Sequence, residues 1–286
     1  MQQMANNSNS VKGGAAKAAA SLAPNPLSAK FSKLLSTNST ISLPNLRSLS
    51  WSGVPREHRG EVWRVLLGYS PANRGRRENV LERKRGEYWK SIEQVGLSPY
   101  MHGSLPSGTS ISSLDVSSLV PPSVLSTIES DTYWCLTSLL STIQDHYTPN
   151  QPGLQRQIHT LGGVVRRTDG RLHRHLEDMG VQYIQFAFKW CNCLLVREFQ
   201  PRTVARLWDT YLSEEGGFST FHVYACASLL TNFSSSLCST YDFGDLFTLL
   251  QQGLPTKEWD DDDVSVMCSQ AFVLKSLFEG SEAHLE

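Results

Sequence analysis

The segment from Tyr183 to Gly216 constrains the fold more strongly than any other part of the sequence. Up to Val196 it is apolar at almost every position around a helical turn, which predicts a helix buried on all sides rather than an amphipathic one. Pro201 cannot extend that helix, but it suits the first position of a new helix, where its missing N–H costs nothing. We therefore expect a buried central helix, a sharp corner and a second helix.

The second helix of this pair has an amphipathic pattern. Its apolar side chains recur at i, i+3, i+4, i+7 and i+8, and two glycines after the stripe are typical of a helix end. The stripe consists of Val204, Leu207, Trp208, Tyr211 and Leu212. Arg206 and Asp209 flank it, three residues apart, a spacing at which helical side chains can form an ion pair. We expect these two residues to pair with each other and to have a structural role.

Composition narrows the class of protein. With 286 residues, of which 40% are hydrophobic, the chain can bury a sizeable core. The 26 basic and 27 acidic residues nearly cancel, so we expect no nucleic-acid partner. Six cysteines without a C-x-x-C pair indicate buried thiols in a reducing, cytoplasmic compartment. No apolar run is long enough for a transmembrane segment.

Changes in composition predict the organisation of the chain. We expect a disordered tail over 1–44, folded parts over 45–93 and 125–279, a Ser/Gly/Pro-rich connector over 94–124, and a short tail over 280–286. Within the first tail, Phe31, Leu34 and Leu35 form the only apolar cluster, which could be a short helix docked on the domain. No alternating strand segment with a hairpin turn occurs, so the predicted fold class is all-α.

The residues indicate no self-contained active site. His173 and His175 are two apart on a predicted helix and point to different sides, which is wrong for sharing a metal ion. Cys191 and Cys193 lie in the most apolar helix, where a thiolate is disfavoured. No Gly-rich phosphate loop, G-x-S-x-G elbow or H-E-x-x-H helix occurs. We expect no metal and no cofactor, and a helical surface that acts on a partner protein.

Two segments resemble signatures of TBC domains, the Rab GTPase-activating family. One runs from Trp51 to Gly68 and the other from Phe186 to Tyr211. The residues that carry the resemblance are Trp51, Gly53, Pro55, Arg59, Trp63, Gly68, Arg206, Trp208 and Asp209. Further motifs resemble the subgroup that contains the TBC domain family member 22 proteins: Tyr133-Trp134-Cys135-Leu136, Gln144-Asp145-His146-Tyr147, Gln151-Pro152-Gly153 and the segment from Leu249 to Pro255.

The resemblance implies an all-helical, V-shaped domain that binds a Rab-type small GTPase. The Rab would carry the GTP and magnesium, and the domain would act in vesicle trafficking, peripheral on Golgi or endosomal membranes through partners such as adaptor proteins. Family members insert an arginine from an I-x-x-D-x-x-R motif and a glutamine from a Y-x-Q-G motif into the partner. The arginine neutralises charge on the transferring phosphoryl group and the glutamine orients the attacking water.

The chain departs from the family at the arginine motif. Ile128-x-x-Asp131 begins like that motif, but Trp134 stands where the arginine belongs. We interpret this stretch as core helix. We expect the catalytic arginine to be absent, and the connector over 94–124 to replace the region that carries the catalytic fingers.

The glutamine motif is also incomplete. Tyr183-x-Gln185 begins like it, but Phe186 replaces the glycine, and Gln252-Gly253 lacks the tyrosine. The chain is therefore predicted to have no catalytic residue and to be a weak or inactive activator. Two alternatives remain open: a non-catalytic scaffold that binds a Rab or an adaptor, and a truncated or spliced product of a gene for an active Rab activator.

Overall fold

The computed structural model describes residues 26–36, 40–95 and 120–279. These residues form α-helices, two short helices of other types and one isolated antiparallel bridge between Thr40 and Asn73. The prediction of an all-α fold is confirmed. The helices are α2 (Pro26–Leu35), α3 (Leu43–Ser50), α4 (Arg56–Leu66), α5 (Arg74–Val95), α7 (Pro122–Ser141), the 3₁₀-helix η1 (Gln144–His146), α8 (Pro152–Thr168), α9 (Gly170–Asp178), α10 (Tyr183–Asn192), α11 (Pro201–Ser213), the π-helix η2 (Gly217–Phe221), α12 (His222–Asn232), α13 (Ser234–Leu237), α14 (Phe243–Gln252) and α15 (Asp261–Phe278).

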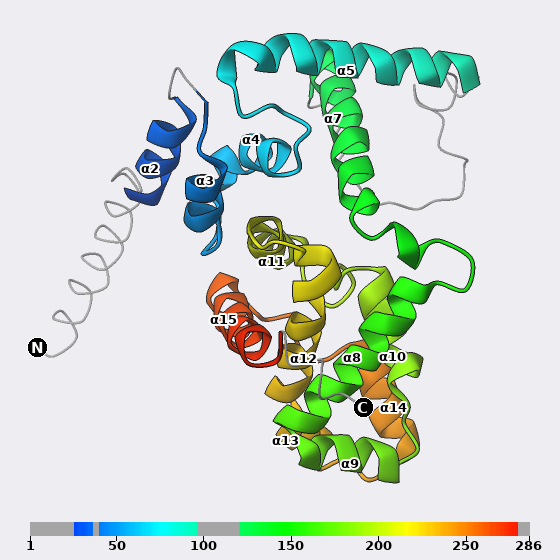
Figure 1. The fold of residues 1–286 in the computed structure, drawn as a ribbon. Helices are drawn as coiled ribbons and strands as arrows, with labels where there is room; N and C mark the ends of the chain where they lie inside the picture. Colours follow the sequence, from blue (N-terminus) through cyan, green and yellow to red (C-terminus); the bar gives the residue numbers. More distant parts are fainter. Residues whose placement is uncertain (1–25, 37–39, 96–119, 280–286) are drawn as a thin grey trace, which may run out of the picture.

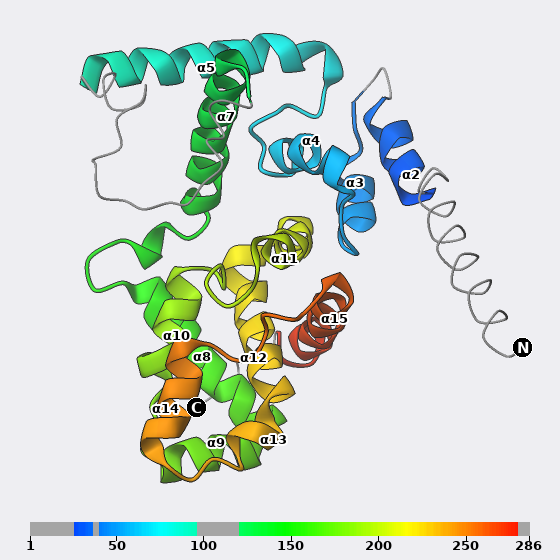
Figure 2. The same ribbon diagram turned by 180° about the vertical axis from the view of Figure 1, so that it is seen from behind.

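The helices form two parts that meet at α11 (Figures 1 and 2). The upper part contains α2 to α5, with α7 descending from α5, and the lower part contains α8 to α10 and α12 to α15. Each part has its own hydrophobic cluster, a small one around Phe31, Leu46 and Val62 and a large one around Trp190 and Leu229. Helix α11 belongs to the large cluster and packs against α3 and α4, so it joins the two parts.

The helix buried on all sides is α12, not α10. Every residue of α12 from His222 to Leu230 is buried, between α8, α10 and α15. In α10, Ile184 is 45% exposed and Phe188 39% exposed. The prediction that the helix beginning at Tyr183 is buried on every side is therefore wrong. An apolar sequence makes burial favourable, but the packing of neighbouring helices decides which faces are covered.

Helix α10 also ends earlier than predicted. It stops at Asn192, and Leu194 and Leu195 adopt left-handed backbone conformations with φ of 52° and 60°. This conformation is costly for residues with a Cβ. Both leucines are nonetheless at most 5% exposed, so the turn is stabilised by their burial. The second predicted helix, by contrast, begins at Pro201 as expected and ends before Gly216, whose φ is 65°.

The N-terminal tail is shorter than predicted. Helix α2 lies inside the range 1–44, and Phe31 and Leu35 are buried against α4. The Phe31 ring stacks on His58 at 5.9 Å. The predicted docked helix is thus present, and the prediction of disorder is wrong over 26–36 and 40–44, because this apolar cluster finds a partner surface on α4. The rest of that tail, most of the 94–124 connector and the 280–286 tail lie outside the described residues.

Candidate functional site

The TBC-like signature residues gather where α11 meets α3 and α4. At the centre is Asp209, whose side chain is fully buried. Its Oδ1 accepts hydrogen bonds from Trp63 Nε1 at 2.7 Å and Arg59 Nε at 3.0 Å. Its Oδ2 accepts from Arg59 Nη2 at 2.9 Å and from the Val54 amide at 2.9 Å. A buried carboxylate requires such partners, and here they come from a segment about 150 positions earlier in the sequence.

The predicted Arg206–Asp209 ion pair does not form. Arg206 donates from Nη1 to Thr210 Oγ1 at 2.8 Å and from Nη2 to Ser265 Oγ at 3.0 Å. Its side chain passes close to Gly53, where an added Cβ would lie 3.0 Å from Arg206 Cδ and where φ is +112°. Asp209 faces α4 and accepts hydrogen bonds from the Arg59 guanidinium there. The Arg59–Asp209 pair between distant segments therefore forms in place of the Arg206–Asp209 pair that the sequence spacing suggested.

The remaining signature residues surround this seam. Trp51 donates from Nε1 to Glu214 at 2.6 Å, and its carbonyl accepts from the Thr210 hydroxyl at 2.8 Å. The Trp208 ring lies 6.1 Å from the Trp63 ring. Pro55 immediately precedes α4, and Gly68 follows it with a φ of 72°. These contacts all join parts of the chain to one another.

A second aspartate, Asp131 of α7, binds the upper part of the molecule together. It accepts from the Tyr69 hydroxyl at 2.7 Å, from Arg85 Nε and Nη2 at 2.8 Å each, and from Arg64 Nη1 at 3.2 Å. These partners come from α4, α5 and the turn between them. Asp131 therefore fixes α7 against α4 and α5.

The pKa values of Asp209 and Asp131 are shifted in opposite directions by burial and by hydrogen-bond partners. Burial raises the pKa of Asp209, and its hydrogen bonds from Arg59, Val54 and Trp63 do not fully offset that rise. Burial also acts to raise the pKa of Asp131, but the hydrogen bonds from Arg85 and Tyr69 and the positive charges outweigh it, so the pKa is lowered. Asp131 thus strongly favours the ionised form in the folded protein.

An apolar cleft of about 410 Å³ lies between these networks. Its walls come from α4, α7 and α11, and they include members of both networks. The lining residues are Gly60, Trp63, Arg64, Leu67, Thr127, Ile128, Asp131, Thr132, Cys135, Leu136, Leu139, Trp208 and Leu212. Ile128 is 53% exposed and Leu136 48% exposed. Burial raises the pKa of the Cys135 thiol to about 11, so this thiol stays protonated and a poor nucleophile at neutral pH. The cleft has the apolar character of a partner-binding surface.

Comparison with known proteins decides the family. Residues 114–238 match the family described as the Rab-GTPase-TBC domain. The crystal structure of the Ypt/Rab-GAP domain of Gyp1p superimposes with a TM-score of 0.75 and 33% identity, over 89% of this chain and 100% of that one. The chain belongs to the TBC domain family.

Sequence relatives agree with this assignment. The TBC domain chain is 38% identical to TBC1 domain family member 22A of Mus musculus, over 89% of its own length and 61% of the relative's. It is 35% identical to the GTPase-activating protein gyp1 of Schizosaccharomyces pombe, over 90% of its length and 62% of that protein's. The chain therefore spans about three fifths of the length of these relatives. The mouse alignment covers 318 residues, more than the 286 of this chain, so this TBC domain has gaps against it.

The incomplete finger motifs of this TBC domain lie on α7, on α10 and at the end of α14. Trp134, at the place of the arginine, donates from Nε1 to the Lys84 carbonyl at 2.8 Å, and Lys84 Nζ lies 3.9 Å from its ring. Gln185 caps α10 by accepting from the Gln182 amide at 2.8 Å. Gln252 ends α14, and Gly253 follows with a φ of 112°.

The histidines and cysteines singled out in the sequence have separate surroundings. His173 Nδ1 lies 3.0 Å from the Tyr183 hydroxyl, whereas His175 Nε2 lies 2.9 Å from the Thr240 carbonyl. The sequence predicted that burial disfavours a thiolate at Cys191. Hydrogen bonds from Cys226 and His222 instead lower the pKa of the Cys191 thiol, so burial alone does not decide its ionisation. Cys191 is only 1% exposed, which keeps it from reacting with a substrate.

The described residues contain neither a metal-binding cluster nor a membrane-spanning helix. No group of three or more His, Cys, Asp and Glu side chains comes together there in a way that could hold a metal ion. Over the same residues, no helix combines the length and the apolar character needed to cross a bilayer.

Proposed function

We propose that this TBC domain chain binds a Rab-type small GTPase and regulates it in vesicle trafficking, with impaired activation of GTP hydrolysis. The observation that carries the Rab partner is the match to the whole Ypt/Rab-GAP domain of Gyp1p. Relatives named GTPase-activating protein support the same class of activity. Peripheral association with Golgi or endosomal membranes through adaptor proteins is part of the proposal. The GTP and the magnesium ion would be carried by the Rab.

The arginines next to the cleft support impaired activation. A catalytic arginine must be free to enter the partner's nucleotide site and neutralise developing charge. Arg64 and Arg85 both bind Asp131, and Arg59 binds Asp209. Withdrawing Arg59 would leave the buried Asp209 carboxylate without its charge partner, and withdrawing Arg64 or Arg85 would remove one of the two charge partners of Asp131, which is costly. Among the described residues beside the cleft, these three arginines are therefore held by carboxylates of the domain itself.

The alignment lengths support the idea that a segment has been lost. Relatives align over more residues than this chain contains, and neither finger motif has a complete match in the sequence. We propose that the connector over 94–124 stands in place of the segment that carries both fingers.

The direct test is single-turnover GTP hydrolysis by a panel of purified Rabs loaded with GTP. We expect hydrolysis to stay at the intrinsic rate when this chain is added, whereas the Schizosaccharomyces pombe gyp1 protein serves as the positive control. A family arginine finger is worth about 10³ to 10⁵ in rate. Stimulation of that size by this chain would overturn the proposed impairment.

Binding without turnover would favour the scaffold alternative. In that case a Rab or an adaptor should bind the chain with a nanomolar to micromolar Kd while hydrolysis is unchanged. Replacing Ile128 by Glu places a charge in the cleft and should weaken binding about tenfold or more. The matched control is Val266→Glu on α15, a residue that is 57% exposed and lies outside the cleft. Equal effects of the two substitutions would show that the cleft is not the binding surface.

The third alternative, a spliced or truncated product, has its own decisive observation. Reading the gene and its transcripts between the codons for Gln94 and Ile128 would show whether unread coding sequence for an arginine and a glutamine motif exists there. A transcript that includes such sequence would mean that the full product is an ordinary Rab activator.

Loss of helices from one core should also leave a trace in stability. The half-exposed side chains of Ile128 and Leu136 are expected to bind a hydrophobic dye more strongly, and the melting temperature to be lower, than in a complete relative. A sharp transition at high temperature with no dye binding would argue that the shortened core is compensated.

A further inference from the structure

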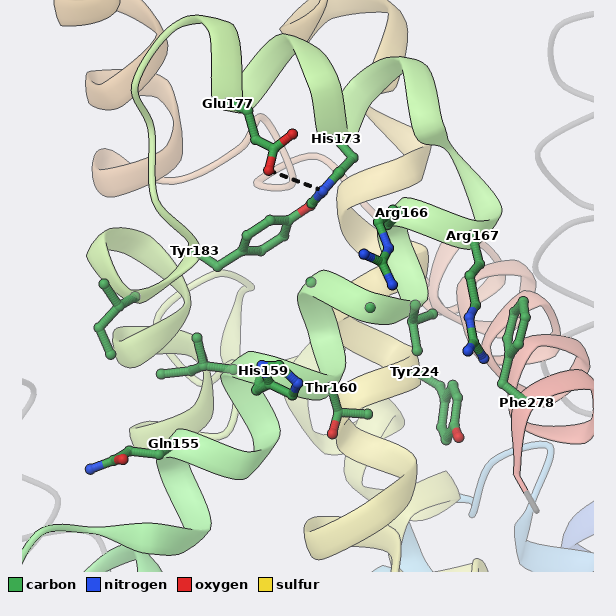
Figure 3. A pocket seen from close by; sticks show the side chains of 15 residues that line it. Gln155, His159, Thr160, Arg166, Arg167, His173, Glu177, Tyr183, Tyr224 and Phe278 are labelled. Carbon is green, nitrogen blue, oxygen red and sulfur yellow. Dashed lines mark hydrogen bonds and ion pairs between the residues drawn. The ribbon is translucent and has the colours of Figure 1, made fainter. Parts of the chain in front are cut away.

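A second, larger cavity lies in the lower part of the molecule and shares no residue with the apolar cleft. Its volume is about 720 Å³, within the range of small-molecule sites. Figure 3 shows its walls, which come from α8, α9, the start of α10, α12 and the end of α15. The family signatures of the Asp209 seam do not reach it. It is therefore a candidate site independent of the proposed Rab surface.

The charged lining of this basic cavity is mainly positive. Arg166 and Arg167 come from the last turn of α8, and His159 and His173 add two imidazoles to the lining. The one acidic side chain among the lining residues is Glu177, whose Oε1 lies 3.4 Å from His173 Nε2. Two arginines against one glutamate give the lining an excess of positive charge.

The two arginines are held differently. Arg167 lies over the Phe278 ring, with its Cζ 5.9 Å from the ring centroid (Figure 3). Arg166 is exposed and has no hydrogen bond or ion pair with any described residue. A guanidinium without a protein partner keeps its fork of donors available for a bidentate contact. Arg166 is thus the side chain best placed to bind an incoming anion.

Two glycines of α8, Gly162 and Gly163, line the basic cavity. The Tyr183 ring packs close to the first of them, because a Cβ at Gly162 would lie 3.5 Å from that ring. The Tyr183 hydroxyl, 3.0 Å from His173 Nδ1, borders the same cavity. The lining of this cavity thus includes the Arg166 guanidinium, two imidazoles and the Tyr183 hydroxyl.

We propose that the basic cavity binds a small ligand that carries phosphate monoesters on a compact polar ring, such as a phosphorylated inositol. Arginine and protonated histidine bind a doubly charged phosphate by charge-assisted hydrogen bonds, and the planar guanidinium matches its oxygens. Either a soluble inositol phosphate or the headgroup of a phosphoinositide lipid has this chemistry. The proposal does not depend on Rab binding.

The test uses the whole chain and two probes. Binding of inositol 1,4,5-trisphosphate is measured by calorimetry, and binding of the corresponding phosphoinositide is measured with phosphatidylcholine vesicles that contain it, against vesicles of phosphatidylcholine alone. We expect Arg166→Glu to weaken binding of the effective probe about tenfold or more. Arg166→Lys, which keeps the charge but loses the fork, should weaken it less.

Arg171→Glu is the matched control. Arg171 is an exposed residue of α9 that does not line the cavity, and the substitution changes the net charge by the same amount. Binding of the soluble probe alone would identify a soluble ligand, and binding that requires the lipid vesicle would identify a membrane headgroup; both support the site. Equal losses in Arg166→Glu and Arg171→Glu, or no binding of either probe, would overturn it. Circular dichroism confirms that each variant is folded.

Discussion

Two aspartates hold this molecule together in different ways. Asp209 is fully buried and takes its donors from one arginine, one indole and one backbone amide. Asp131 has a side chain that is 9% exposed, and its partners Arg64 and Arg85 are 29% and 30% exposed. The first network closes the seam between the two parts of the fold, where the Arg59 side chain is 20% exposed, and the second borders an apolar cleft.

The difference shows how much the surroundings of an ion pair matter. At Asp209, burial outweighs the partners and the pKa is raised. At Asp131, the guanidinium groups and the Tyr69 hydroxyl outweigh burial and the pKa is lowered. A buried pair is costly to break because the remaining group is stranded away from water, whereas a partly exposed partner can be rehydrated. The Asp209 seam should therefore be the more fragile one to mutate.

The largest effect is expected for Asp209→Ala. This change strands Arg59, Trp63 and the Val54 amide, and it should lower the free energy of unfolding by about 3 to 5 kcal/mol. Denaturant titration followed by circular dichroism measures the loss. The control is Asp178→Ala, an exposed position at the end of α9, which should change stability by less than about 0.5 kcal/mol. A loss at Asp209 no larger than in the control would contradict its role as the centre of the seam.

A smaller loss is expected for Asp131→Ala. Because Arg64 and Arg85 are each about one third exposed, water can replace the lost carboxylate, and we expect a cost of about 2 kcal/mol. Hydrogen exchange should show the loosening mainly in α5 and α7, which the Asp131 network connects. If this variant were less stable than Asp209→Ala, the Asp131 network and not the Asp209 seam would be the more fragile one to mutate.

The contributions of Asp131 and Asp209 to stability are expected to change in opposite directions as the pH falls. The lowered pKa of Asp131 contributes stability above the unfolded value of about 3.9, and this contribution is lost as the pH falls through the folded pKa. The raised pKa of Asp209 acts oppositely, because its protonation in the folded state adds stability as the pH falls towards the unfolded value. Melting temperatures from neutral to acidic pH should thus fall less steeply in Asp131→Asn than in the unmodified chain.

Asp209→Asn should show the reverse change over the same pH range. It removes a group whose protonation stabilises the folded state, so its melting temperature should fall more steeply on acidification than that of the unmodified chain. Parallel curves for the two variants would mean that the opposite shifts of the two aspartates do not contribute to stability.

The smallest effect is expected for Trp63→Phe. The change removes the indole N–H that Asp209 Oδ1 accepts at 2.7 Å but leaves the Arg59 and Val54 donors. We expect a loss of about 1 kcal/mol in the free energy of unfolding. Trp89→Phe is the matched control, because Trp89 is a half-buried residue of α5 away from the seam. A loss of about 3 kcal/mol or more at Trp63 would mean that the indole, and not the Arg59 guanidinium, is the main partner of Asp209.

The sequence predicted local features well where the signal was local. Pro201 begins α11, as predicted. Local capping is also seen elsewhere in the structure, where Asp242 caps α14 and Asp260 caps α15. The apolar stripe of α11 is largely buried as its spacing indicated. Capping and helical periodicity depend on neighbouring residues in the chain, so they can be read without knowledge of the fold.

Interactions between distant segments could not be predicted in the same way. Sequence spacing offered Arg206 as the partner of Asp209, but Arg59 reaches it from α4. A usable signal existed, because Arg59 and Trp63 are four residues apart and share one helix face, yet nothing in the spacing said what that face would meet. The basic cavity was also missed, since its residues lie on five different helices.

Local periodicity and motifs that occur in order along the chain were enough to predict most helices and the TBC family from the sequence. The tertiary structure was needed to show which apolar helix is the buried centre, which cation neutralises Asp209, and where the apolar cleft and the basic cavity open. Several partners could bind the same buried groups, and the packing of the helices decides which of them lies close enough to do so.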